Sequence, residues 1–128
     1  MIKANILDDF KQIKKLDTQN MLGSLESLGE QLKEICKIGK KLKISTNYKK
    51  IDKILVLGMG GSEINFQVIK TLFAAELKAP LEIVSDYHLP GWVDKNTLVI
   101  GSSYSGGTEE VLNAAEEAMI RGAKLLVL

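Results

Sequence analysis

Two short loops rich in glycine and hydroxyl side chains each follow an apolar run and precede a helix-like run. The first covers residues 58–62, after the apolar residues 54–57, and the second covers residues 102–110, after residues 97–100. Backbone N–H groups in such loops, together with the amino end of a helix, are suited to binding a phosphate. Two of these loops, at the carboxyl ends of two strands, predict one anion site that is built from both sides.

The second loop has the more specific chemistry. Ser103, Ser105 and Thr108 carry hydroxyl groups spaced two and three residues apart, and Gly106 and Gly107 allow a tight turn and close approach to a ligand. One capping residue would satisfy the helix that follows. The hydroxyl groups of this loop exceed that need, so the pattern favours a bound tetrahedral oxyanion over simple helix capping.

The first loop is less specific. Gly58 and Gly60 match the start of a dinucleotide fingerprint, but Glu63 stands where its third glycine would fall. Asp86 follows the second predicted strand and could hold a ribose hydroxyl, so a dinucleotide-binding domain stays open as an alternative. The sequence contains no GxxxxGK[ST] loop and no GxSxG elbow, which disfavours a P-loop nucleotidase and an α/β-hydrolase.

The composition is that of an ordinary soluble domain. The 128 residues are 45% apolar and 26% charged, with a formal net charge of +1. This balance gives no overall field for nucleic acid or an anionic membrane, so selectivity for an anion must be local. The few aromatic residues are scattered, which argues against a surface for stacking nucleic-acid bases.

The chain has one cysteine, Cys36, and one histidine, His88. An internal disulfide is therefore impossible, which suits a reducing cytoplasm, and we expect neither a metal nor a cofactor. Cys36 lies in a helical apolar pattern and is interpreted as a buried, inert thiol. His88 lies beside Pro90 in a loop and is interpreted as a surface or packing residue. No apolar run is long enough to span a bilayer, so no membrane association is expected.

Residues 1–50 have a helical pattern. Residues 17–20 offer helix caps, and an apolar stripe follows at alternating spacings of four and three, formed by Met21, Leu25, Leu28, Leu32 and Ile35. We expect this stripe to pack on the body of the protein, with a partner helix in a dimer as the alternative. The lysines between residues 37 and 50 are interpreted as a solvated linker, and a nucleic-acid patch is the less favoured reading.

Residues 51–128 alternate between short apolar runs and helical patterns. Predicted strands cover residues 53–57, 81–84, 97–101 and 124–128, and predicted helices cover residues 62–77 and 108–121. This alternation predicts an α/β fold, in which a parallel sheet is covered by helices on both faces. The sequence stops on four apolar residues, 125–128, so we expect it to be part of a longer protein.

The order of several motifs resembles the sugar isomerase (SIS) domain, and more narrowly the bifunctional phosphoglucose/phosphomannose isomerases. These motifs are Gly58-Met59-Gly60-Gly61-Ser62, Tyr87-His88-Leu89-Pro90 and Ser103-Tyr104-Ser105-Gly106-Gly107-Thr108-Glu109-Glu110. Asp17-x-x-Asn20-Met21 is similar to the family's N-terminal helix, and Arg121-Gly122-Ala123 also matches. The resemblance covers nearly the whole chain.

The resemblance implies a flavodoxin-like three-layer sandwich with N-terminal helices, residues 1–50, before a first SIS domain, residues 51–128, incomplete at its end. It implies interconversion of glucose 6-phosphate or mannose 6-phosphate with fructose 6-phosphate, without metal or cofactor, by a cytoplasmic homodimer with two SIS domains per chain. Such enzymes serve glycolysis and gluconeogenesis. A phosphosugar-sensing SIS module without catalysis is the alternative.

Carried over by position, Ser103, Ser105 and Thr108 would hold the phosphate, and three residues would contact the sugar end: Gly60, Gly61 and Ser62. Gly107 departs from the usual asparagine, and residues 63–66 depart from the usual Ala-Ile-Gly-Gly. The family's catalytic glutamate, histidine and lysine lie beyond the last residue given. The sequence therefore predicts the binding part of the enzyme and no catalytic residue.

Overall fold

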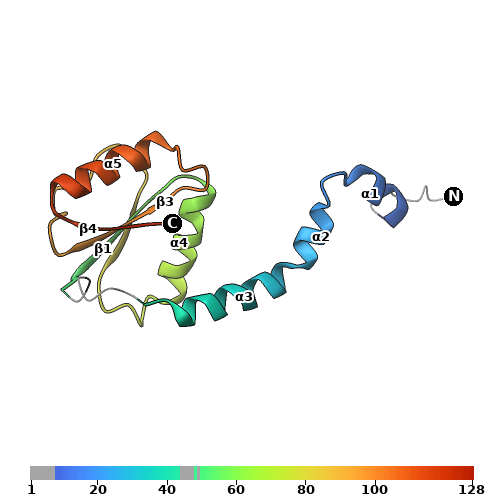
Figure 1. Ribbon diagram of the computed structural model, residues 1–128, viewed down its shortest axis with the longest axis horizontal. Coiled ribbons are helices and arrows are strands. Elements are labelled where there is room, and N and C mark those ends of the chain that lie inside the picture. Colours follow the sequence, from blue (N-terminus) through green and yellow to red (C-terminus); the bar gives the residue numbers. More distant parts are fainter. Residues whose placement is uncertain (1–7, 44–47, 49) are drawn as a thin grey trace. The chain divides into compact units, whose positions relative to one another are not determined.

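The computed structural model describes residues 8–43, 48 and 50–128, and the chain divides into two compact units after residue 44 (Figure 1). The first unit contains three helices, α1 (Phe10–Leu16), α2 (Met21–Glu26) and α3 (Leu28–Lys41). α2 begins after Asn20, its N-cap residue, whose side chain makes no capping hydrogen bond. The carboxylate of Asp17 accepts hydrogen bonds from the first N–H groups of the helix instead, those of Met21 at 2.6 Å and Leu22 at 2.9 Å. Both residues lie in the predicted capping segment 17–20.

The apolar stripe of the first unit is exposed. Its five side chains, from Met21 to Ile35, have exposed fractions between 48% and 62%, and none of the three helices buries a residue. A string of single helices has no second layer to cover its apolar side. For the same reason the prediction of a buried Cys36 is wrong, since its thiol is exposed.

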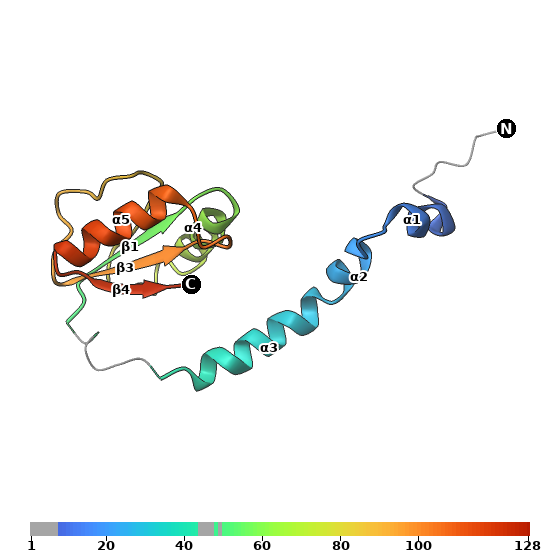
Figure 2. The same cartoon turned by 45° about the horizontal axis from the view of Figure 1, so that its top comes forward.

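The second unit is built on a four-stranded sheet, in which every pair of neighbours is parallel (Figure 2). Its strands, in the spatial order β2-β1-β3-β4, are β2 (Leu81–Val84), β1 (Lys53–Gly58), β3 (Thr97–Ser102) and β4 (Lys124–Val127). The predicted parallel α/β fold is confirmed. β1 and β3 each extend one residue further than predicted, so that Gly58 and Ser102 still belong to the sheet.

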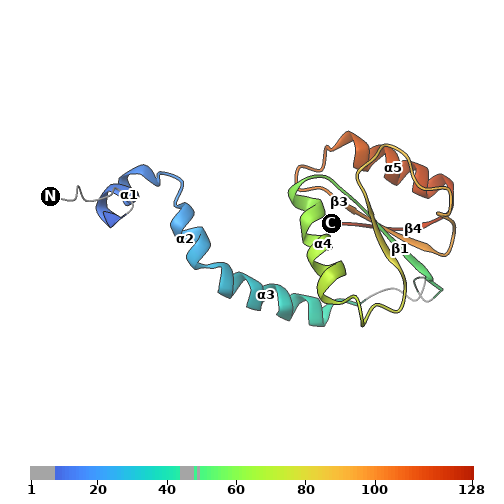
Figure 3. The same ribbon diagram turned by 180° about the vertical axis from the view of Figure 1, so that it is seen from behind.

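Two helices follow the central strands: α4 (Gly61–Leu72) after β1 and α5 (Glu109–Ile120) after β3. Side chains alternate between the faces of a strand, so Leu55 and Leu57 face one side and Val56 the other. The side of Leu55 and Leu57 packs against α5, while α4 contacts β1 and β2. The connection from β1 to β2, which contains α4, and the connection from β3 to β4, which contains α5, lead in opposite directions across the sheet. Because such connections are right-handed, the two helices lie on opposite faces of the sheet (Figures 1 and 3).

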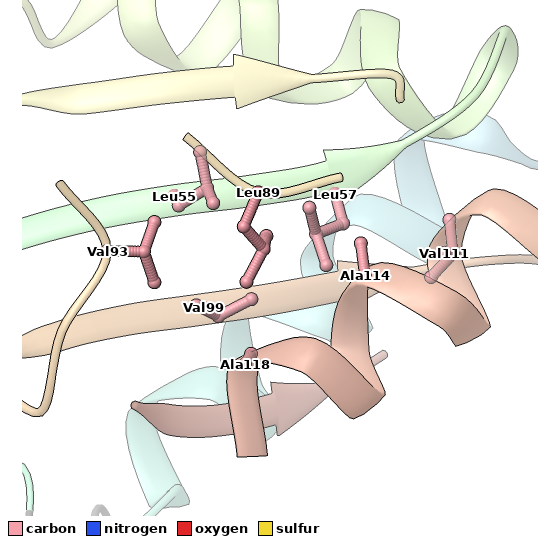
Figure 4. Close-up of a cluster of buried hydrophobic side chains, with 8 residues drawn as sticks. All are labelled: Leu55, Leu57, Leu89, Val93, Val99, Val111, Ala114 and Ala118. Atoms are coloured by element: carbon pink, nitrogen blue, oxygen red, sulfur yellow. The ribbon is translucent and has the colours of Figure 1, made fainter. Parts of the chain in front are cut away.

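The face under α5 holds the main core (Figure 4). Small residues of α5, Ala114 and Ala118, allow the helix to approach the sheet closely, and both are fully buried. The other members of this cluster are Leu55, Leu57, Leu89, Val93, Val99 and Val111. The opposite helix, α4, buries no residue, and its outer side carries Ile64, Val68 and Leu72, all exposed. It ends at Leu72, five residues earlier than predicted.

The close packing under α5 predicts a large cost for a cavity there. Leu55→Ala should lower the free energy of unfolding of the second unit by about 2–5 kcal/mol, because Leu55 is 0% exposed. Leu112→Ala, at a position of α5 that is 55% exposed, should cost less than about 1 kcal/mol. Urea titration followed by the fluorescence of Trp92 measures both. Equal losses of unfolding free energy in the two variants would contradict this packing.

Candidate functional site

The two glycine loops begin side by side at the carboxyl edge of the sheet. Gly58, the last residue of β1, is the register partner of Ser102, the last residue of β3. The chain runs from β1 to β2 on one side and from β3 to β4 on the other, so the point between the loops is where the strand order reverses. Ligands of open α/β sheets bind at such a point.

Three hydroxyl groups form a compact triangle in the second loop. The Oγ of Ser103 lies 2.8 Å from the Oγ1 of Thr108 and 3.4 Å from the Oγ of Ser105, and the third side, between Ser105 and Thr108, is 3.5 Å. These are the three side chains proposed from the sequence to hold a phosphate. The structure brings them together, although they are spread over six positions of the chain.

The backbone of this loop closes around the triangle. The N–H group of Gly106 donates to the Oγ of Ser103 at 3.2 Å, and that of Gly107 donates to the Oγ of Ser105 at 3.3 Å. Thr108 is the N-cap residue of α5, but its side chain makes no capping hydrogen bond. The hydroxyl of Thr108 contacts the other hydroxyls of the loop, so it does not serve the capping role that was the simpler interpretation.

The first loop is folded tightly onto the start of α4. A Cβ atom on Gly58 would lie 3.3 Å from the backbone nitrogen of Glu63, so only glycine fits there without displacement. Gly60 has φ 56° and ψ −120°, and it precedes α4 directly. The carboxylate of Glu63 accepts hydrogen bonds from Ser85 and Gln67, which lower its pKa below the ordinary value. The loop is therefore held by its surroundings.

The segment after β2 is clamped to α5 by two residues that sequence reasoning did not single out as a pair. Glu117 accepts a hydrogen bond from the N–H group of Leu89 at 3.0 Å, and Arg121 donates to the carbonyls of Pro90 at 2.7 Å and Leu89 at 3.3 Å. Glu117 and Arg121 also form an ion pair one helical turn apart. Arg121 also belongs to the Arg121-Gly122-Ala123 match found in the sequence. Neither that match nor the spacing of four residues identifies the loop of Leu89 and Pro90 as the partner.

The remaining polar residues of this segment have local roles. The carboxylate of Asp86 accepts from the N–H group of His88, and the side chain of His88 is 82% exposed, as its surface interpretation predicts. Tyr87 lies near the first turn of α5, where the negative charge of Glu110 raises the pKa of its phenol. Asn113 donates to the carbonyl of Tyr87 at 2.9 Å, which ties this turn to α5.

The hydroxyl loop lies on the surface. Tyr104 to Gly107 are exposed, and a cavity of about 300 Å³ lies away from the loop, near Lys53, Leu81 and Trp92. In the part of the chain that the structure describes, no cluster of three metal-binding side chains occurs. None of the described helices is long and apolar enough to cross a membrane.

The positive φ of 68° at Gly106 predicts a selective effect of added side chains. Gly106→Ala should lower the stability of the second unit by about 1 kcal/mol, because an L-residue is strained there. Gly107→Ala is the matched control, since a Cβ has open space at both positions and only Gly106 has a positive φ. Urea titration measures the difference. A larger loss for Gly107→Ala would contradict the loop conformation.

Glu117 predicts a pH-dependent clamp. The Leu89 N–H group and then Arg121 hold its pKa below the ordinary 4.5. A carboxylate with a lowered folded pKa stabilises the protein above the unfolded pKa, and this contribution disappears as the pH falls through the folded pKa. Glu117→Gln should therefore lower the melting temperature at pH 7, and the difference from wild type should shrink below about pH 4.5.

Thermal unfolding, followed by the fluorescence of Trp92, measures this difference at each pH. Glu116→Gln, at the exposed neighbouring position of α5, is the control and should leave the melting temperature at pH 7 nearly unchanged. If the difference in melting temperature between Glu117→Gln and wild type stayed constant from pH 7 to pH 3, the carboxylate charge would not be what holds the loop.

Comparisons with known proteins show which proteins the chain is similar to. No family model matches the chain. A bifunctional phosphoglucose/phosphomannose isomerase of Caldicellulosiruptor bescii is 39% identical over 84% of the chain and 32% of that protein, and one of Thermoplasma acidophilum is 47% identical over 56% of the chain and 22% of that protein.

A crystal structure described as a candidate phosphosugar isomerase from Salmonella typhimurium LT2 has the same fold. It superposes with a TM-score of 0.55 and 24% identity, over 67% of the chain and 31% of that protein. The chain spans about a third, or less, of the length of the relatives it matches. The resemblance to the bifunctional phosphoglucose/phosphomannose isomerases and their SIS fold, predicted from the motifs, is therefore confirmed.

Proposed function

We propose that this chain binds a hexose 6-phosphate, as the sugar-phosphate-binding SIS domain of a phosphoglucose/phosphomannose isomerase. The observation that carries the proposal is the triangle of hydroxyl groups from Ser103, Ser105 and Thr108, with sides of 2.8 to 3.5 Å, at the start of α5. Oxygen atoms of a tetrahedral phosphate need several donors within a few ångströms of one another. The relatives named as sugar-phosphate isomerases support the same reading.

The donors for the phosphate come from two sources. The hydroxyl groups bond to one another in the free loop, and each can turn its hydrogen toward an incoming phosphate oxygen. The first N–H groups of α5 lack partners within the helix, and the helix dipole favours an anion at that end. This site uses neither lysine nor arginine, so binding depends on donor geometry. Glu109 and Glu110, in the same first turn, must point away from the bound phosphate.

The sugar end would lie over the first loop. Adjacent strands are about 4.8 Å apart, so a hexose phosphate can span from one loop to the other. Gly60 and Gly61 present backbone without side chains, and Ser62 adds a hydroxyl in the first turn of α4. We propose these three residues as contacts to the sugar, with Ser103, Ser105 and Thr108 on the phosphate.

The isomerisation itself requires a base that moves a proton between neighbouring carbons of the sugar. We assign this role to none of the described residues of the two loops, because the resemblance places the family's catalytic glutamate, histidine and lysine outside residues 1–128. We propose that residues 51–128 supply binding within a cytoplasmic, homodimeric enzyme of glycolysis and gluconeogenesis. It would interconvert glucose 6-phosphate or mannose 6-phosphate with fructose 6-phosphate. A sensing module without catalysis is the second candidate.

A thermal-shift titration tests the ligand class. Fructose 6-phosphate at one hundred times its dissociation constant should stabilise the fold by about 2.7 kcal/mol, and NAD should have no effect. The double variant Ser105→Ala/Thr108→Ala should lose the stabilisation, because two corners of the triangle are removed. Thr71→Ala, an exposed hydroxyl of α4 that bonds only to Gln67 of its own helix, is the control. Stabilisation by NAD alone would support a dinucleotide site in place of this one.

A further inference from the structure

Ser85, the first residue after β2, links the two ends of the glycine loop. Its hydroxyl oxygen lies 2.7 Å from the carbonyl oxygen of Gly58 and 2.8 Å from a carboxylate oxygen of Glu63. Gly58 is the last residue of β1, and Glu63 lies in the first turn of α4. One side chain from the segment after β2 therefore contacts the loop on both sides of the residues proposed to meet the sugar, Gly60 to Ser62.

The bonds that the glycine loop makes by itself are short-range backbone ones, from the N–H group of Ser62 to Met59 and from that of Glu63 to Gly60, both 3.2 Å. Gly60 and Gly61 have no side chains, and a Cβ added to either would meet no atom within 4 Å. Gly60 also adopts a conformation, φ 56° and ψ −120°, that side chains disfavour. The backbone bonds lie within the loop and the first turn of α4, so they do not tie the loop to the segment after β2. Any ordering of the loop that is left to the binding step costs free energy. Ser85 provides a hold that lies outside the loop.

The carboxylate of Glu63 is the second part of this hold. Its Oε2 atom accepts from Ser85, and its Oε1 atom accepts from the side-chain amide of Gln67 at 3.2 Å. Both partners of Ser85 are acceptors, so its single hydroxyl hydrogen is shared between them. Gln67 keeps the carboxylate oriented when that hydrogen points to Gly58. The arrangement fixes the first turn of α4 relative to the end of β1.

We propose that Ser85 is a positioning residue for the sugar side of the site. It does not contact the ligand but holds the backbone of Gly60 and Gly61 in the conformation that receives the sugar. This inference rests on the proposed function and deepens it, because it separates the two halves of the site. The phosphate loop is built from its own residues, whereas the sugar loop depends on Ser85, from the segment that follows β2.

The test compares fructose 6-phosphate with inorganic phosphate, which occupies only the phosphate loop. Ser85→Ala should weaken the affinity for fructose 6-phosphate by about tenfold, which is the effect of losing one hydrogen bond that orders the loop. The affinity for inorganic phosphate should stay unchanged. Ser85→Thr keeps the hydroxyl and should restore affinity. Ser105→Ala should weaken the affinity for both ligands. Calorimetric titration of the whole chain measures the affinities.

A second measurement needs no ligand. In the amide NMR spectrum of the free protein, Ser85→Ala should shift or broaden the signals of Gly60 and Gly61 and leave those of Gly106 and Gly107 in place. The positioning role would be overturned if Ser85→Ala and wild type bound fructose 6-phosphate with equal affinity. It would also be overturned if Ser85→Ala lost affinity for fructose 6-phosphate and inorganic phosphate to the same extent. Undisturbed Gly60 and Gly61 signals would overturn it as well. If the wild type binds no fructose 6-phosphate, the proposed function falls, while the NMR result still reports whether Ser85 holds the loop.

Discussion

The pairing of β1 with β3 is the contact on which the rest of the site depends. This parallel ladder sets Gly58 opposite Ser102, so two loops that are more than forty residues apart in the chain start about one strand spacing from each other. The next strands leave to opposite sides, so the space above this pair is not crossed by a connection. The proposed sugar phosphate would lie across this edge, in contact with both loops.

The two helices that follow these strands are held in different ways. α5 packs Val111, Ala114 and Ala118 into the core, and Glu117 and Arg121 tie it to the loop of Leu89 and Pro90. The first turn of α5 is therefore fixed by the burial of Val111, and its last turn by hydrogen bonds, so the helix that follows the hydroxyl loop is held at both ends. α4 buries no residue, and its first turn relies on the contact of Glu63 with Ser85.

Apolar runs bounded by glycine and proline were enough to predict the strands and their parallel arrangement, because burial on both faces leaves a local signature in the sequence. The three hydroxyl residues were also predictable, since they lie within one loop. Ser85, Glu117 and Arg121 were not, because each acts through a contact with another element, and their spacing names no partner. The thiol of Cys36 was misplaced because helical periodicity shows which side is apolar and not whether anything covers it.

The two loops should differ in how they respond to substitutions elsewhere in the protein, because one is held by contacts within the loop and the other by contacts with distant residues. The hydroxyl triangle needs only a short stretch of chain in one conformation, so the proposed phosphate site should tolerate change elsewhere in the protein. In the proposed arrangement the glycine loop takes its shape from Ser85 and Glu63, so substitutions after β2 or in the first turn of α4 would alter the sugar side without touching the phosphate. A domain of this construction could then keep one anchoring group for its ligands while the part that distinguishes one sugar from another varies.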